Sequence, residues 1–269
     1  MDFSRSGRWY RALLPALLLL AGATQAQAQA EAEAEAEEAP GFDRPGLGFS
    51  TNPLHAGQFG FEQGLPDWSR HRDAGTTSDL ATYDSLLRLG LGSGFELQLG
   101  GSPYNRLRQT GDGPSQTSHG RGDTSLSLKW APPSSSEAWN WGVLGTMEFT
   151  DGARNFRSDR RVYTVGAVLD QKLNERTDIS YFAQWQRSGG RDNYLLAPDY
   201  NYELTDQVGV YLEAAFLRDA DYRNGTQAGG GLSWQPLHNL QFDTWFRHRL
   251  SGQAATWEAG VGVAMLFGR

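Results

Sequence analysis

Alternation of apolar and polar residues is the feature that most limits how this chain can fold. At residues 257–267, Trp257, Val261, Val263 and Phe267 share one parity, and Glu258 has the other. A period of two places alternate side chains on opposite faces of a β-strand. The pattern recurs about twelve times, in segments that begin near residues 58, 82, 95, 123, 139, 161, 177, 193, 207, 228, 240 and 256. The chain is therefore predicted to be all-β.

Segment length favours a membrane location for these strands. Most segments span roughly nine to eleven residues, the length that a tilted strand needs to cross a bilayer. Strands of soluble proteins average about five or six residues. The mean hydropathy of −0.54 excludes a helical membrane protein, which needs runs of about 20 apolar residues. We predict a single up-and-down antiparallel transmembrane β-barrel of about 12 strands; the alternative is a periplasmic β-sandwich that binds a ligand.

The connections between segments alternate in length. Longer ones are expected at 65–79, 103–122, 150–160 and 217–227, and shorter ones at 92–94, 172–176, 205–206 and 236–239. Outer-membrane barrels have short periplasmic turns and longer extracellular loops. Whether 103–122 folds into the barrel as a plug stays open at this stage.

Aromatic residues fall near the ends of the apolar faces. With both termini in the periplasm, Trp130, Trp234 and Phe267 belong to the periplasmic ends. The outer ends hold Phe149, Tyr163, Trp185, Phe216, Phe246 and Trp257. Two interfacial aromatic belts are typical of a barrel in lipid.

The amino terminus has the pattern of an export signal. Arg5, Arg8 and Arg11 precede an apolar run at 12–23, and alanines at alternate positions then offer cleavage sites. We expect a signal peptide at 1–30, an acidic Ala/Glu-rich spacer and N-terminal arm at 31–57, and the barrel at 58–269. The predicted location is the outer membrane.

Composition narrows the partners. The chain has no cysteine, which excludes a disulfide scaffold and Cys-ligated zinc, and its net charge of −7 argues against nucleic acid. The expected partners are outer-membrane lipid with lipopolysaccharide and a small-molecule solute. The chain is expected to be monomeric and to bind no cofactor.

The polar parity of each strand supplies the candidate pore-lining residues. They are Arg88, Glu96, Lys129, Glu148, Asp170, Glu213, Asp243, Arg247 and Glu258, together with Glu62. A barrel of about twelve strands predicts a narrow channel, and the acidic excess of these residues predicts a mild cation preference. In the alternative, the carboxylates pair with Arg88, Lys129 and Arg247 and hold a plugged lumen together. Glycines at 100, 142, 166, 209, 229, 231, 260 and 262 either spare lumen volume or allow strand curvature.

Two further sets of residues suggest weaker hypotheses. The loop arginines Arg154, Arg157, Arg160 and Arg161 either bind lipid phosphates or form a solvated loop. A barrel esterase would need a serine beside a histidine, but Ser251 lies on the wrong side of the pleat from His248. The chain is therefore not expected to be an enzyme.

Three stretches carry a family resemblance. They are FGFEQGLPDWSR (59–70), SLLRLGLGSGFELQLGGSPYNRLR (85–108) and GRGDTSLSLKWA (120–131). The chain resembles outer-membrane proteins named for the MetA pathway of phenol degradation. The resemblance implies a β-barrel and passage of small molecules, including aromatic ones, but it transfers no catalytic or binding residues. The function expected is a passive transporter or channel.

Overall fold

The strands form one closed ring. The computed structural model describes residues 40–268 except 135, 137 and 221–223, so the predicted signal peptide lies outside the described residues. Its strands are β1 (Phe59–Asp73), β2 (Thr76–Gly92), β3 (Phe95–Thr110), β4 (Gln116–Gly120), β5 (Thr124–Trp130), β6 (Trp139–Glu148), β7 (Val162–Asn174), β8 (Thr177–Ser188), β9 (Arg191–Thr205), β10 (Val208–Arg218), β11 (Asn224–Leu237), β12 (Leu240–Gly252) and β13 (Trp257–Phe267).

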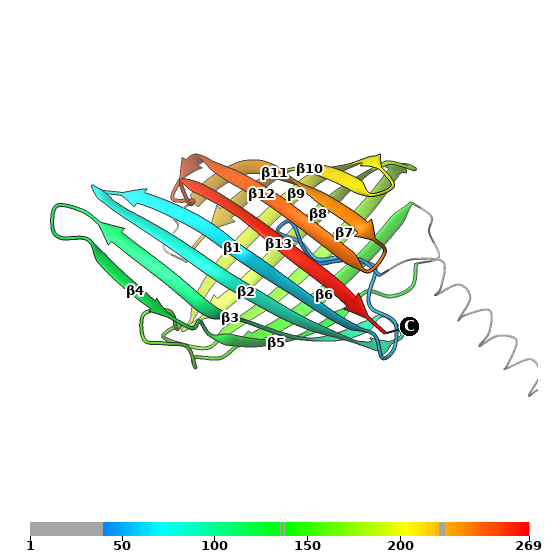
Figure 1. Cartoon of the computed structure of the whole chain (residues 1–269), viewed down its shortest axis with the longest axis horizontal. Coiled ribbons are helices and arrows are strands. Elements are labelled where there is room, and N and C mark those ends of the chain that lie inside the picture. Colours follow the sequence, from blue (N-terminus) through cyan, green and yellow to red (C-terminus); the bar gives the residue numbers. More distant parts are fainter. Residues whose placement is uncertain (1–39, 135, 137, 221–223, 269) are drawn as a thin grey trace, which may run out of the picture. The chain divides into compact units, whose positions relative to one another are not determined.

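Closure comes from β1, which pairs with β13 on one side and β2 on the other (Figure 1). Among the described residues β4 pairs with β3 alone, so twelve strands make the ring. The predicted twelve-stranded antiparallel barrel is confirmed, and the β-sandwich is excluded. We call the end with connection 149–161 the outer end, and the end with turns 93–94 and 175–176 the periplasmic end.

Two of the predicted long loops were wrong. Strand β1 runs to Asp73 and β2 starts at Thr76, so only a two-residue turn remains of the loop expected at 65–79. Strand β3 continues to Thr110, and β4 occupies part of the loop expected at 103–122. In both places a register shift interrupts the ladder. In β1 the shift lies between Gly64 and Asp67, and in β3 it lies between Gly101 and Tyr104, which pairs with Tyr83 of β2. A bulge inverts the parity of every later residue, and this inversion hid the strand extensions.

The two faces of the wall have inverted polarity relative to a soluble protein. Leu99 and Leu128 on the outer surface are 48% and 49% exposed, whereas Arg88 and Lys129 inside are fully buried. Apolar side chains outside and charged ones inside are the arrangement of a barrel in lipid. Among the described residues, no helix has the length and apolar character needed to span a membrane.

Aromatic side chains gather where the outward face nears the periplasmic end. Trp130 stacks on Phe95 at 5.8 Å between ring centroids and packs edge-on against Trp141 at 5.4 Å. Trp234 stacks on Phe242 at 5.6 Å. Toward the outer end, Tyr163, Phe216, Phe246 and Trp257 are exposed on the same outward face. These positions are those expected for two interfacial belts.

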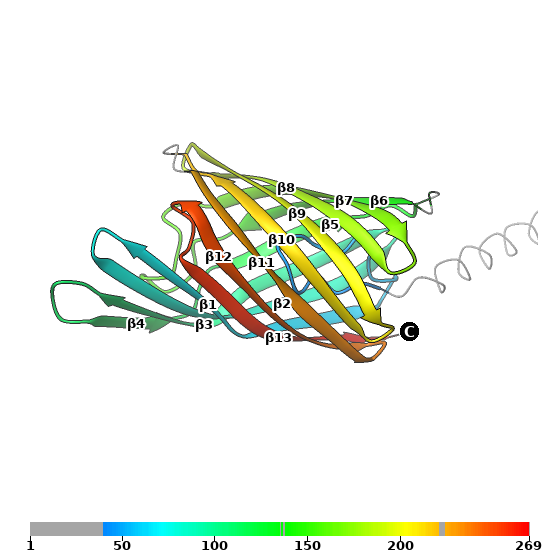
Figure 2. The same cartoon turned by 90° about the horizontal axis from the view of Figure 1, so that it is seen from above.

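Residues 40–57 lie inside the barrel, where Figures 1 and 2 show them as a blue segment ahead of β1. We call this segment the arm. Two apolar clusters join it to the wall: Phe42 and Leu54 pack with Ala264 and Leu266, and Phe49 packs with Val168, Phe182 and Ala197. The arm thus adds a small apolar core to an otherwise polar lumen.

A charge placed on the outward face tests the lipid location. Leu99 lies directly between Leu87 of β2 and Leu126 of β5. We expect Leu99→Arg to lower the free energy of unfolding in lipid vesicles by about 2–4 kcal/mol, because a cation at mid-bilayer loses its hydration. Denaturant titration measures the change. Gln109→Arg, at the exposed outer end of the same strand, is the control; equal stability of both variants would contradict the lipid location.

Candidate functional site

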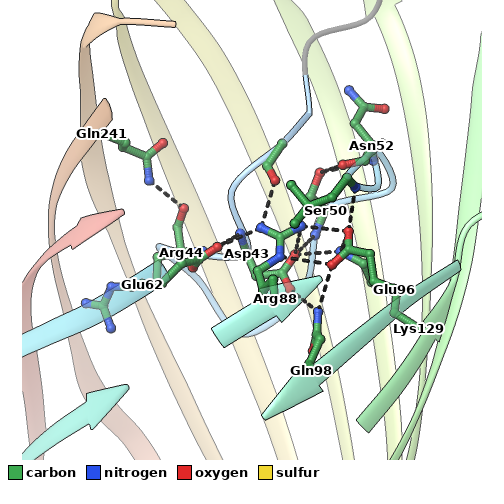
Figure 3. A network of polar contacts seen from close by, with 12 residues as sticks. Asp43, Arg44, Ser50, Asn52, Glu62, Arg88, Glu96, Gln98, Lys129 and Gln241 are labelled. Atoms are coloured by element: carbon green, nitrogen blue, oxygen red, sulfur yellow. Dashed lines mark hydrogen bonds and ion pairs between the residues drawn. The ribbon is translucent and has the colours of Figure 1, made fainter. Parts of the chain in front are cut away.

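The centre of the lumen is a buried guanidinium group. Arg88 Nη1 lies 2.7 Å from Glu62 Oε1, and its Nη2 lies 2.8 Å from Glu96 Oε1 (Figure 3). Arg88 Nε also donates to Glu96 Oε2 at 3.0 Å. The three side chains come from the adjacent strands β2, β1 and β3, and each is essentially inaccessible to solvent. Lys129 of β5 lies directly opposite Glu96, with its Nζ 2.9 Å from Glu96 Oε1.

The arm contributes a third carboxylate to this cluster. Asp43 Oδ1 lies 3.0 Å from Lys129 Nζ and 3.5 Å from Arg88 Nη2. Burial raises the pKa of Asp43, but Arg88 and Lys129 outweigh that effect and leave the pKa below its ordinary value. Asp43 is therefore ionised at neutral pH. We call Asp43, Glu62, Arg88, Glu96 and Lys129 the central cluster.

Backbone groups of the arm also bind the central cluster. Glu62 accepts hydrogen bonds from the backbone N–H groups of Asp43 and Arg44, both at 2.9 Å. Glu96 accepts one from Leu54 N at 2.8 Å, and Arg88 Nη1 donates to Gly41 O at 2.8 Å. Hydrogen bonds from N–H groups to ionised carboxylates are strong, so these contacts hold the backbone of the arm against the wall.

A second anchor lies one residue further along the arm. Arg44 bridges Asp67 of β1 at 3.0 Å and Asp243 of β12 at 3.1 Å. Glycine makes room for it, because a Cβ at Gly262 would lie 2.3 Å from Arg44 Nε. Gly142 and Gly166 similarly face the ring of Phe49. At Gly262 and Gly142, the absence of a side chain spares volume that the arm fills, whereas at Gly166 the nearest ring is that of Phe182 in the wall.

The structure divides the predicted pore-lining residues among several places. Arg88, Glu96 and Lys129 meet in the central cluster. Arg247 forms a separate group, 2.5 Å from Glu213 and 3.7 Å from Glu258.

The remaining three predicted residues lie apart. Asp243 binds Arg44. Asp170 accepts hydrogen bonds from Thr51 of the arm, at 2.5 Å, and from Ser180. Glu148 accepts one from Ser158 of the outer connection at 2.8 Å. The pairing weighed as an alternative is thus present for most of these carboxylates, with arm residues among the partners.

Sequence reasoning missed Asp43, Arg44 and Asp67. The first two precede the first strand, where no periodicity assigns a direction to a side chain. Asp67 follows the β1 bulge, so simple parity did not place it inside. The glycines facing the arm were the available signal, but they were equally compatible with strand curvature.

The arm borders two cavities. The outer cavity has a volume of about 650 Å³ and extends from Arg44 to Asp123 and Phe156 near the outer end. The periplasmic cavity has a volume of about 370 Å³ and reaches Lys172 and Arg176 at the periplasmic turns. Asp43, Gly48 and Phe49 of the arm and Phe182 of β8 line both cavities, so the arm forms part of the boundary between them.

The connection 149–161 covers part of the outer end. Asp123 accepts hydrogen bonds from the backbone N–H groups of Gly152 and Ser158, at 2.7 and 2.6 Å. Asp151 accepts one from Thr124 N and pairs with Arg121 at 3.1 Å, and these contacts lower the pKa of Asp151 to about 2. This connection contributes Asn155 and Phe156 to the lining of the outer cavity, and Asn105 and Leu107 of β3 line the same cavity.

His248 makes contacts that suit the aromatic belt. Its ring lies 4.0 Å from that of the partly exposed Trp257, and its Nδ1 is 2.8 Å from Thr256 O. Among the described residues, no group of His, Asp and Glu side chains has a metal-binding arrangement.

Removing the central cation tests the role of the central cluster in stability. We expect Arg88→Met to cost about 3–5 kcal/mol of unfolding free energy, because it leaves Glu62 and Glu96 buried with one fewer cation. Urea unfolding in vesicles measures the cost. Arg187→Met, which breaks the half-exposed pair with Asp192, is the matched control and should change stability little. Equal effects would contradict a special role for the central cluster.

Solved structures with the same architecture are outer-membrane proteins. An outer membrane channel from Pseudomonas putida F1 is 13% identical, with a TM-score of 0.61 over 83% of this chain and 99% of that one. The KdgM porin in complex with disordered oligogalacturonate is 11% identical, with a TM-score of 0.53 over 78% and 99%. The translocator domain of autotransporter NalP from Neisseria meningitidis is 13% identical, with a TM-score of 0.52 over 91% and 98%. This likeness establishes the outer-membrane β-barrel fold.

Sequence comparison gives the family. No curated protein matches the chain. A family profile matches residues 42–267, which include most of the arm and every barrel strand. The chain therefore belongs to the family described as "Putative MetA-pathway of phenol degradation", in agreement with the resemblance found in its sequence.

Proposed function

We propose that this barrel is a passive channel for small solutes, with the arm as its constriction. The observation that carries the proposal is the pair of cavities that meet at Asp43 and Phe49. A barrel with a purely structural role would need no such volume on both sides of one short segment. Solutes would enter the outer cavity, pass the arm and leave through the periplasmic cavity.

Charge favours cations along this route. The central cluster is largely neutralised by internal pairing, so it contributes little net charge. Beyond it, the outer cavity is lined by Asp84, Asp123 and Glu148. Carboxylates outnumber cations in the periplasmic cavity as well, where Asp170, Glu175, Asp178, Asp199 and Glu203 face Lys172 and Arg176. Rings of carboxylates attract cations into pores.

The outer cavity also offers apolar contacts. Leu80, Leu86, Leu107, Leu144 and Phe156 line it beside the carboxylates. Binding sites for small organic molecules combine apolar walls with a few polar groups. This lining, together with the family's description, supports small aromatic compounds as one class of solute.

Ion selectivity provides the first test. In planar bilayers with a potassium chloride gradient, we expect the reversal potential to have the sign that indicates a preference for potassium over chloride. Asp178→Asn/Glu203→Gln should reduce that potential, because it removes two carboxylates from the periplasmic cavity. Asp112→Asn/Asp159→Asn makes the same charge change on exposed outer connections and should leave the potential unaltered. Anion selectivity would overturn the cation preference, and absence of conductance would favour a plugged barrel.

The arm provides the second test. Asp43→Asn/Arg44→Met keeps the net charge but removes the ion pairs that the arm's side chains make with the wall, so the arm should be held less firmly and conductance should rise several-fold. Arg187→Met/Asp192→Asn removes an ion pair of the same type from the outer end and should not alter conductance. Liposome swelling with charged, sugar and aromatic solutes then compares the two variants. Unchanged conductance in the arm variant would contradict a constriction at the arm.

A further inference from the structure

The outer parts of β1, β2, β3 and β4 form a small sheet that projects beyond neighbouring strands (Figure 2). The last residue of β1 paired with β13 is Arg70, whereas pairing with β2 continues to Asp73. Beyond Gly101, the neighbour of β3 is β4 in place of β5. This sheet therefore presents an outward face of its own, next to the lipid-facing wall.

Toward the outer end, the side chains on this outward face change from apolar to aromatic, and on β1 and β3 they then change to arginine. Along β3 it runs from Phe95, Leu97 and Leu99 through Tyr104 to Arg106 and Arg108. On β2, leucines give way to Tyr83, whose ring lies 5.8 Å from that of Tyr104. On β1, Trp68 is followed by Arg70 and Arg72. Aromatic residues mark the level of the lipid headgroups, so the arginines lie at or just above it.

The register gathers these arginines into one patch. Arg70, Asp79 and Arg108 lie side by side on three strands, and Asp79 pairs with Arg70 at 2.6 Å. Arg106 lies between Ala81 and His119, so no carboxylate opposes it across either ladder.

Charge in the patch is strongly positive. Arg72, Arg106 and Arg108 are exposed, and no ion pair to them occurs among the described residues. We call Arg70, Arg72, Arg106 and Arg108 the basic patch; its four cations face one acid, Asp79.

We infer that the basic patch binds the phosphate groups of the outer-leaflet glycolipid. Residues two apart on a strand are about 7 Å apart, so Arg106 and Arg108 can each present a planar fork to one phosphate or to neighbouring ones. The patch lies on the outside of the wall, beside the aromatic level, where a phosphate attached to membrane lipid would be held. A dissolved solute on its way through the lumen would not meet it.

The basic patch differs from the loop arginines considered in the sequence. Arg154 and Arg157 lie in the connection 149–161, whose Asn155 and Phe156 line the outer cavity. They lie between β6 and β7 and not on the outward face of a strand. They therefore provide a control with the same residue type and a similar exposure.

Lipid binding by the full-length processed chain tests the inference. The folded protein in detergent is titrated with bis-phosphorylated lipid A, and bound lipid is counted by native mass spectrometry. We expect Arg106→Gln/Arg108→Gln to weaken binding at least about tenfold, because two charge-assisted contacts are lost. Arg154→Gln/Arg157→Gln should bind as the unmodified protein does. Heat-modifiable migration on a gel verifies folding, and Arg106→Lys/Arg108→Lys, which keeps the charge, should lose less affinity than the glutamine variant.

Three results would overturn the inference. Equal binding of lipid A stripped of its phosphates would assign the contact to acyl chains. If inorganic phosphate at the same concentration as the lipid displaced lipid A from the protein, the patch would be a site for free anions. An equal loss in the Arg154/Arg157 variant would indicate general electrostatic attraction in place of a defined site. The channel recordings are independent of all three, so failure here leaves the proposed function unaffected.

Discussion

The buried ion pairs around Arg88 are the interaction on which the lumen depends. Charged groups removed from water are costly unless each finds a partner, and here three carboxylates share two cations. Two of those carboxylates, Glu62 and Glu96, come from the wall, and the third, Asp43, comes from the arm. Because Asp43 also contacts Lys129, the arm adds a third carboxylate that both cations of the cluster hold inside the barrel. The segment ahead of the first strand is thus an integral part of the barrel interior.

This arrangement determines what the rest of the lumen can do. Pairing removes most of the net charge of the central cluster, so carboxylates outside it set the field along the proposed path. The arm also lines both the outer and the periplasmic cavity, and glycines on the wall accommodate Arg44 and Phe49. In the proposed channel, passage would depend on how firmly the arm is anchored, and ion preference would depend on the groups around the cavities.

Bulges explain both the success and the limits of reading the strands by parity. Each barrel strand was predicted, because alternation over about ten residues is a strong signal and most ladders are regular. At Leu65–Pro66 and near Pro103 an extra residue inverts the parity, so segments that are strands looked like loops. The basic patch was missed for the same reason, since Arg106 and Arg108 had no assigned face. The longer connections expected at the outer end are likewise partly strands, because β1, β2 and β3 extend into them.

The sequence by itself determined the barrel: its strand number, its antiparallel order and the side of each regular strand that faces lipid. These properties follow from the alternation of apolar and polar residues within each segment, which is a local property of the sequence. It also identified most charged residues of the lumen, but not their partners. Only the tertiary structure decided that Asp43 and Arg44 enter the lumen, that Asp243 pairs with Arg44, and that the outer ends of β1–β4 carry one basic face. Those contacts join residues up to 199 positions apart, and pairing at such separations depends on closure of the ring and on bulges that no local pattern encodes.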